Sequence, residues 1–243
     1  MKVIKIIIVV SIFLLSFWVY AYAEDLVGAR ILNQALDAEY SSIGTLYPDG
    51  FHVTLSLSME SRYKGKQINK ATCTSTIEEL LGSFWFDKMN GVSGKHLKGS
   101  YRNNNLFLVS YESQPSEPYA IDSDIFNHFM HLKKSIFDDW KNRYEHYKTS
   151  MIFTNQKEEF LEGKEVHVIT GKLSGNSSHY TYHDISLLSL NLESKIEKTT
   201  HIPLSFILNV EYAQKNNGGD AVYFKENFEL TITERHAVPH DET

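Results

Sequence analysis

Apolar and polar residues alternate over residues 51–63, and this is the clearest pattern in the chain. Phe51, Val53, Leu55, Leu57 and Met59 occupy the odd positions, with polar side chains between them. A period of two predicts a β-strand with one dry face and one wet face. A strand of about twelve residues exceeds the usual five or six, and such long strands are typical of curved sheets and barrels.

More strands are predicted toward the carboxyl end of the chain. From residue 164 onward, apolar runs or alternation recur over 164–173, 180–192, 204–212 and 222–232, with polar turns such as 174–176 and 216–219 between them. Another hairpin is expected from strands 95–102 and 106–111, around three consecutive asparagines that tolerate positive φ. Short loops between neighbouring strands require the strands to be antiparallel.

Three segments have helical features. Residues 25–40 carry apolar side chains at helical spacing, and residues 123–147 keep a period near 3.6 with a wide aromatic face, capped by Asp122 or Ser123. Ser75 followed by Glu78 has the form of a capping box, which predicts a third helix over 75–90. Pro115 and Pro118 indicate a loop before the long helix.

Helices at the start and middle of the chain, with strands on either side, predict an α+β fold. We expect a single domain over residues 24–243, with a frayed tail from about residue 235. Its core would be a curved antiparallel β-sheet, similar to a half-barrel, packed on two or three helices.

The amino terminus has the features of a cleavable export signal. Lys2 and Lys5 lie close to the apolar run 6–20, and Ala21-Tyr22-Ala23 places small residues where signal peptidase requires them. An uncleaved anchor is the alternative, because residues 6–23 approach the length that spans a bilayer. The cleavage motif favours removal of residues 1–23, which gives a periplasmic or secreted protein without a stable membrane anchor.

Composition limits the partners of the mature protein. Removing Lys2 and Lys5 leaves 22 of the 24 Lys and Arg residues against 30 Asp and Glu, a net charge of −8. Mild acidity repels phosphate polymers, so no nucleic-acid partner is expected, and an anionic membrane is not expected as the main partner. Cys73 is the single cysteine, which excludes an intrachain disulfide. Its thiol is either a small buried side chain or a reactive group that could form an intermolecular bridge.

Motifs for catalysis, metal binding or a cofactor are not recognisable. His128 and His131 have a suitable spacing on a helix, but no third ligand is indicated. His179 and His183 would lie about 13 Å apart in a strand, too far to share a metal. No G-x-S-x-G or glycine-rich nucleotide loop is present in the sequence. We therefore expect a non-enzymatic protein without a cofactor or metal.

Aromatic residues are concentrated on the segments predicted as helices 75–90 and 123–147. They could simply fill a core, or they could line an apolar cavity that holds an acyl chain. Periodicity does not separate these alternatives, because a filled core and an empty one use the same side chains. The candidate ligand-binding residues are Phe129, Phe137, Trp140 and Tyr144.

Two segments in the carboxy-terminal third resemble a known family. Residues 162–169 (EGKEVHVI) look like a strand of exported proteins that carry lipid, and residues 196–204 (IEKTTHIPL) are similar to the turn and strand "I-D-K-x-T-x-L-P-L" of that group. The group is the LolA/LppX-like periplasmic lipid- or lipoprotein-binding proteins. The resemblance implies a half-barrel of antiparallel strands that covers short helices and holds lipid, but it transfers no individual site residue.

The sequence thus predicts an exported binding protein that carries or senses an apolar ligand, such as a lipid or acyl chain in the cell envelope. The alternative is a protein-interaction module, for example an inhibitor, an immunity factor or an accessory protein of an envelope complex. A hydrolase whose site is assembled from distant residues is a third possibility.

Overall fold

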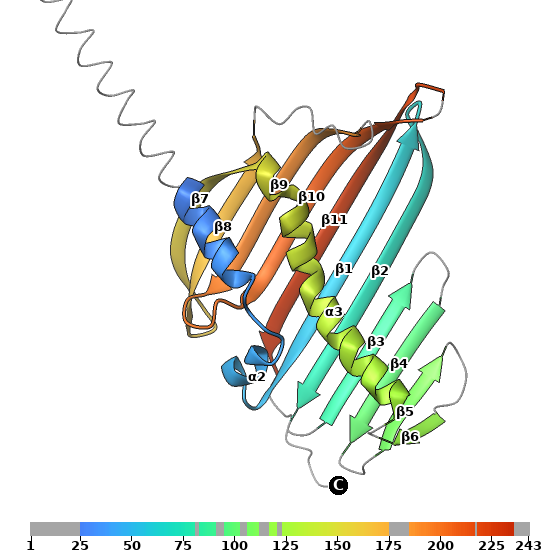
Figure 1. Cartoon of the computed structure of the whole chain (residues 1–243), viewed down its shortest axis with the longest axis vertical. Coiled ribbons are helices and arrows are strands. Elements are labelled where there is room, and N and C mark those ends of the chain that lie inside the picture. Colours follow the sequence, from blue (N-terminus) through green and yellow to red (C-terminus); the bar gives the residue numbers. More distant parts are fainter. Residues whose placement is uncertain are drawn as a thin grey trace, which may run out of the picture.

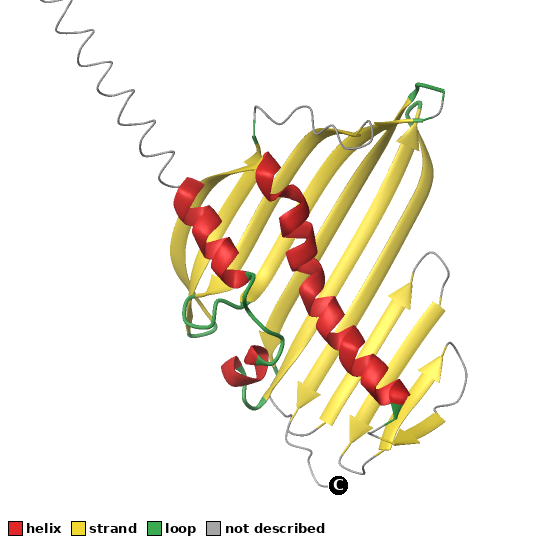
Figure 2. Ribbon diagram, viewed as in Figure 1, coloured by secondary structure: helices red, strands yellow, loops and turns green. Residues whose placement is uncertain are grey.

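One large curved sheet dominates the protein. The computed structural model describes residues 25–80, 83–90, 95–102, 106–111, 117–120, 123–174, 185–216 and 218–235. Within these ranges eleven antiparallel strands follow the order β6-β5-β4-β3-β2-β1-β11-β10-β9-β8-β7, and the helices lie on one face of the sheet (Figure 1, Figure 2). This confirms the expected fold class, a curved antiparallel sheet packed on helices.

The strands and helices have the following bounds. The strands are β1 (Gly50–Tyr63), β2 (Lys66–Leu80), β3 (Ser83–Asn90), β4 (Lys95–Arg102), β5 (Leu106–Tyr111), β6 (Glu117–Ala120), β7 (Met151–Leu161), β8 (Lys164–Leu173), β9 (Ile185–Glu197), β10 (Pro203–Lys215) and β11 (Ala221–Glu234). The helices are residues 25–35, α2 (Ser42–Leu46) and α3 (Asp124–Tyr147), which continues into the short 3-10 helix η1 (Lys148–Ser150).

Two meanders meet at the centre of the sheet. Strands β1 to β6 form the first meander and β7 to β11 the second, and they join where β1 pairs with β11. Val53 lies opposite Ile232 and Leu55 opposite Leu230 in this pairing, so the dry faces of the two meanders are continuous. Helix α3 connects the meanders and crosses the concave face of the sheet (Figure 1).

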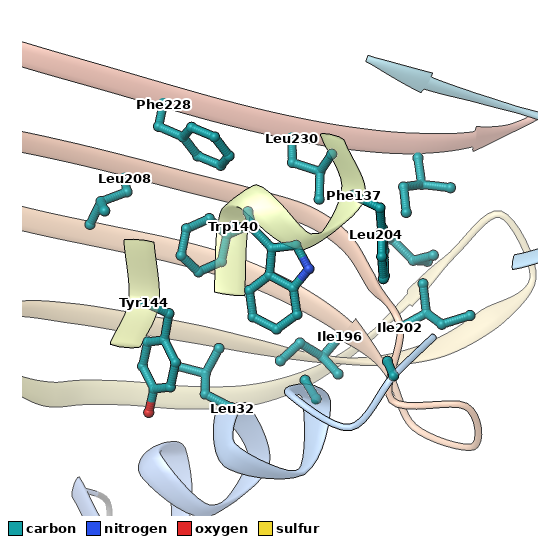
Figure 3. Close-up of a cluster of buried hydrophobic side chains, with 14 of the residues drawn as sticks. Leu32, Phe137, Trp140, Tyr144, Ile196, Ile202, Leu204, Leu208, Phe228 and Leu230 are labelled. Carbon is teal, nitrogen blue, oxygen red and sulfur yellow. The ribbon is translucent and has the colours of Figure 1, made fainter. Parts of the chain in front are cut away.

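The core lies between α3 and the centre of the sheet. The Trp140 ring of α3 packs against Phe206 of β10, with centroids 5.4 Å apart, and Phe206 contacts Phe228 of β11 edge-on at 5.9 Å. Figure 3 shows Trp140 and Tyr144 between Leu32 of the first helix and the inward side chains of the sheet. All these side chains are fully or almost fully buried, so this part of the half-barrel is filled.

The start of α3 is as the sequence predicts. Ser123 adopts an extended conformation before the helix, and its Oγ accepts a hydrogen bond from the Phe126 N–H at 3.3 Å. The hydroxyl thereby satisfies one of the backbone donors that a helix amino terminus leaves without a partner.

Two lysines of α3 fix the helix to its surroundings. Lys133 pairs with Glu79 of β2, and Lys141 donates a hydrogen bond to the Ala38 carbonyl.

The prediction of a helix over residues 75–90 is wrong, because residues 75–80 form the end of β2 and residues 83–90 form β3. Ser75, Ile77 and Glu79 lie opposite Leu55, Val53 and Phe51 of β1 and share their concave face. The β-branched residues Thr72, Thr74, Thr76 and Ile77 also favour a strand. Glu78 therefore does not cap a helix but points to the convex face, where it lies 3.5 Å from His52.

Four further differences separate the predicted elements from the observed ones. The first helix ends at residue 35 rather than near 40, and Pro118 belongs to edge strand β6 instead of a loop. The sequence interpretation missed β7, an edge strand in the observed sheet. Strand β9 runs from Ile185 to Glu197, later than the expected 180–192. The Asn103-Asn104-Asn105 turn and residues 180–184 lie outside the described residues.

Candidate functional site

Helix α3 crosses the concave face diagonally and leaves part of it open. Toward the top of the view, the ends of β1, β2, β10 and β11 are not covered by any helix in the described part of the chain (Figure 1, Figure 2). We call this region the upper concave surface; its apolar residues are Leu57, Met59, Ala71, Cys73, Tyr212, Val222 and Phe224, all with partly or largely exposed side chains.

The strand register places these side chains together. Leu57 lies opposite Cys73 and Met59 opposite Ala71 on the β1–β2 ladder. Tyr212 lies opposite Phe224 on the β10–β11 ladder. Successive residues in a strand point to opposite faces, so these pairs share the concave face with the buried core. Ala71 and Cys73 are small, which leaves a shallow floor beside the longer side chains of β1.

Aromatic rings form the other side of this surface. The Tyr212 and Phe224 rings stack at 4.9 Å between centroids with 11° between their planes. Burial raises the pKa of the Tyr212 hydroxyl, which keeps this ring uncharged. An open hollow of about 310 Å³ lies at the strand ends, lined by Gln214, Lys215, Asn216, Val222 and Phe224. The surface therefore combines apolar rings with a polar rim at the end of the half-barrel.

An ion pair marks the boundary between the filled core and the upper concave surface. The Arg143 guanidinium of α3 pairs with Glu226 of β11 and lies 3.3 Å from Asp139, with its carbon centre 4.5 Å from the Phe228 ring centroid. Glu226 is 8% exposed. A buried carboxylate needs a charged partner, so this pair holds the carboxy-terminal part of α3 on the sheet.

The four aromatic candidates from the sequence all lie on α3 and point into the core. Phe129, Phe137, Trp140 and Tyr144 are between 0% and 2% exposed. Phe137, Trp140 and Tyr144 belong to the cluster in Figure 3. Phe129 lies farther along the helix, with its ring 5.3 Å from that of Phe86. Burial raises the pKa of the Tyr144 hydroxyl to about 12, with smaller contributions from Glu145 and Asp25.

Sequence reasoning named Cys73, Leu57 and Met59 but did not identify the upper concave surface as a candidate ligand site. The inward positions of its residues follow from the alternation in β1, β10 and β11, but alternation does not tell which part of the inner face a helix covers. Only the diagonal path of α3 distinguishes Met59 from Leu55: Met59 is 37% exposed and Leu55 is 5% exposed. Cys73 is half-buried on this surface, between the two alternatives expected for it.

One arrangement on the convex face has the order of a hydrolytic triad. His52 Nε2 lies 2.9 Å from Thr54 Oγ1, and His52 Nδ1 lies 3.5 Å from a Glu78 oxygen. Thr54 stands in the middle of a strand, paired with Thr231 on one side and Thr76 on the other. The backbone N–H groups next to Thr54 take part in the strand pairing. They are therefore not free to stabilise an oxyanion beside its hydroxyl, as a hydrolase would require. This arrangement does not favour a hydrolase.

The other histidines give no metal site within the described residues. His128 and His131 are both exposed on α3, and no group of three potential ligands occurs in the described part of the chain. His179 and His183 lie outside it. Across the same residues, none of the helices combines the length and the apolar character that a bilayer crossing requires.

Comparisons with known proteins give one structural likeness to the family that the sequence resembles. No protein-family model matches the sequence, and no curated protein matches it. Among solved structures, the chain is similar to the LolA superfamily protein NE2245 from Nitrosomonas europaea, over 89% of this chain and 97% of that one, with 9% identity and a TM-score of 0.27. The likeness extends well beyond the carboxy-terminal third.

Two crystal structures of PNGF-II are also similar to parts of the chain. Each covers 76% of this chain at 10% identity, with TM-scores of 0.18 and 0.15, over 28% and 29% of their own length. TM-scores at these levels, including that of the LolA superfamily protein, are too low to support an argument about function. The function is therefore argued from the geometry of the concave face.

Proposed function

We propose that the protein is an exported, non-enzymatic binding protein that holds an apolar ligand, such as a lipid or acyl chain, on the upper concave surface. The observation that carries this proposal is the uncovered apolar stretch of the inner sheet face beside α3. Contiguous apolar surface left open on a folded protein is typical of interaction and ligand sites. A concave site with a few polar groups at its rim is typical of small-molecule binding.

The shape of the surface suits an extended chain. Leu57 and Met59 lie along β1, and Cys73 and Ala71 lie beside them on β2, so the floor follows the direction of the strands. An acyl chain on this floor would remain between the Tyr212–Phe224 stack and the neighbouring strands. The four aromatic candidates of α3 would contact such a ligand only if the helix moved away from the sheet; in the present arrangement they close the core.

Export is supported by the signal features of residues 1–23 and by the way the next residues pack. Residues 25–35, the first described residues after the expected cleavage site, are helical. Its Asp25 accepts a hydrogen bond from the Phe153 N–H of β7 at 2.7 Å. This hydrogen bond fixes the helix of residues 25–35 to the edge of the sheet. We propose a periplasmic or secreted location on this basis.

Binding of a fluorescent fatty acid to delipidated protein tests the proposal. Ala71 and Thr72 are neighbours on β2 that face the concave and convex sides respectively. A carboxylate at position 71 would require a charge to be desolvated by the bound chain, so Ala71→Asp should weaken binding at least about tenfold. Thr72→Asp is the matched control and should leave the affinity unchanged. Absence of saturation, or equal effects of the two substitutions, would contradict the proposal.

A second candidate function, a protein-interaction module, is favoured by the edge strand β7. This strand ends one side of the sheet, and its Phe160 is 76% exposed. Lys157, Glu158 and Glu159 place charges along the same edge, which discourages unspecific strand pairing. A partner captured from envelope extract by the native protein and lost with Phe160→Ser would support this function. A partner retained by Phe160→Ser would exclude the β7 edge as its binding site.

A further inference from the structure

We propose that the tip of the β1–β2 hairpin, residues 62–70, docks the protein onto an anionic lipid surface. We call this segment the cationic tip. The inference concerns where the protein binds rather than what it carries, so it does not depend on the apolar-ligand proposal.

The cationic tip is positively charged, whereas the whole chain carries a net negative charge. Arg62, Lys64, Lys66 and Lys70 occur within nine residues that contain no Asp or Glu, in a chain whose net charge is −6. The Arg62 and Lys64 side chains are 61% and 71% exposed. Lys66 and Lys70 are exposed as well, and neither forms an ion pair within the described residues. Arg62 pairs with Glu60, and Lys64 lies close to Asp220, so Lys66 and Lys70 are the cations of the tip that can face an external anion.

The local backbone projects an apolar side chain between these cations. Lys64 and Gly65 have positive φ values of 48° and 77°, which form the two-residue turn of a tight hairpin. The register shifts behind the turn, where Ser61 pairs with Asn69 but Arg62 pairs with Gln67. Ile68 is the extra residue of this bulge and is 59% exposed. Bulges commonly redirect a side chain at the end of a sheet.

The cationic tip is part of the same end of the half-barrel as the upper concave surface. Tyr63 lies opposite Val222, and its hydroxyl donates to Asp220 of the β10–β11 turn at 2.5 Å. Lys64 lies 3.6 Å from the same carboxylate. These contacts fix the two hairpin ends side by side. A lipid surface in contact with the cationic tip would therefore lie close to Phe224 and the open hollow.

Exposed apolar side chains favour a lipid surface over a soluble polyanion. Nucleic acid or an acidic protein would interact with the four cations but would not remove Ile68 from water into an apolar phase. A bilayer interface does both, because lysine and arginine remain at the headgroups while an apolar side chain enters the acyl boundary. Each unpaired cation near an anionic bilayer contributes about fivefold to the partition coefficient, so Lys66 and Lys70 together give an attraction of about 25-fold.

Co-sedimentation of the mature protein with vesicles tests this inference. Vesicles of phosphatidylcholine alone are compared with vesicles containing phosphatidylglycerol, without added fatty acid. We expect binding to the anionic vesicles only, and binding should weaken when the salt concentration rises. Lys66→Glu combined with Lys70→Glu should lower the partition coefficient at least about 30-fold. Lys134→Glu combined with Lys172→Glu, at two exposed positions outside the tip, is the matched control and should have little effect.

The apolar contribution needs its own variant. Ile68→Ser should reduce binding to anionic vesicles by about tenfold. Leu26→Ser removes an apolar side chain that is 53% exposed on the first helix and should leave vesicle binding unchanged. The proposal is overturned if the two charge-reversed proteins bind vesicles equally. It is also overturned if native protein binds heparin or DNA but not the anionic vesicles, or if Ile68→Ser binds vesicles as native protein does.

Discussion

Arg143 of α3 forms an ion pair with Glu226 of β11 beneath the helix, where the filled core meets the upper concave surface. The two residues come from opposite ends of the second half of the chain, and Arg143 also lies above the Phe228 ring. This contact holds the carboxy-terminal part of α3 on the sheet, beside the part of the concave face that stays open. Its energetic role can be measured directly.

Arg143→Met should lower the free energy of unfolding by about 3 kcal/mol, because it leaves the buried Glu226 carboxylate without its partner. Glu226→Gln should lower the free energy of unfolding by less, because Arg143 still has Asp139 as a charged partner at 3.3 Å. Urea unfolding of both variants measures the difference. The double variant Arg143→Met/Glu226→Leu should be more stable than Arg143→Met alone, because the carboxylate without a partner is gone and two apolar side chains replace the pair. A double variant no more stable than Arg143→Met would contradict this account.

The close packing between the first helix and β7 gives a second prediction. A Cβ added at Gly28 would lie 2.8 Å from the Phe153 Cβ, so Gly28→Ala should force the helix away from the sheet. We expect a loss of about 1–3 kcal/mol in the free energy of unfolding. Gly44→Ala in α2 is the control, because an added Cβ meets nothing within 4 Å there. It should stabilise the protein by up to about 1 kcal/mol. Thermal unfolding of both variants checks the prediction. Similar changes in melting temperature for Gly28→Ala and Gly44→Ala would contradict it.

Trp140 should contribute to stability in a way that Trp85 does not. Trp140 is fully buried, whereas Trp85 is 38% exposed. Trp140→Ala should therefore lower the free energy of unfolding by about 3–5 kcal/mol, and Trp85→Ala should lower it by much less. Chemical denaturation of the two variants checks the prediction. Equal losses would show that the region around Trp140 is not the tightly filled core described here.

Glu197 at the β9–β10 turn gives the fold a pH dependence. Burial tends to raise the pKa of this carboxyl, but hydrogen bonds from the Thr200 hydroxyl and from the Thr200 and Thr199 N–H groups outweigh burial and lower the pKa. A carboxyl with a lowered pKa in the folded state stabilises the protein above its unfolded pKa, and the contribution is lost as the pH falls through the folded value.

The comparison of native protein with Glu197→Gln isolates this contribution. At pH 7 the variant should be less stable by about 2 kcal/mol, because it loses charge-assisted hydrogen bonds. The difference in stability between the two proteins should shrink as the pH falls below about 4.5. In that range the Glu197 carboxyl of the native sequence takes up a proton when the chain is unfolded. Urea midpoints at several pH values provide the measurement. A stability difference that is independent of pH would rule out the ionised carboxylate as its cause.

The long elements of this fold could be predicted from the sequence because they are exposed on one side only. Phe51, Val53 and Leu55 alternate with polar residues in β1, and Ser123 precedes a helical period in α3. Strand β7 escaped prediction because its alternation is short. Met151 and Phe153 are buried, but the register shifts between Phe153 and Asn155, and Thr154 and Asn155 are consecutive and both exposed.

The error over residues 75–90 has a different origin. Ser75 and Glu78 have the spacing of a capping box, but Ser75 and Ile77 also have the spacing of a strand face. Local pattern alone does not choose between the two, and pairing with β1 over the full length of β2 decides the outcome. The pairing of β1 with β11 is equally beyond local patterns, because it joins residues from opposite ends of the chain. The upper concave surface results from that pairing and from the path of α3.

The most direct test of the proposed ligand site uses Cys73, the single cysteine, which is half-buried on the upper concave surface. The rate of its reaction with a small thiol reagent is measured with and without saturating fatty acid. The control is Cys73→Ser combined with Thr72→Cys, which places the thiol on the convex face. The account predicts that bound fatty acid slows the reaction at position 73 and leaves the rate at position 72 unchanged. An unchanged rate at Cys73 in the presence of bound fatty acid would contradict it.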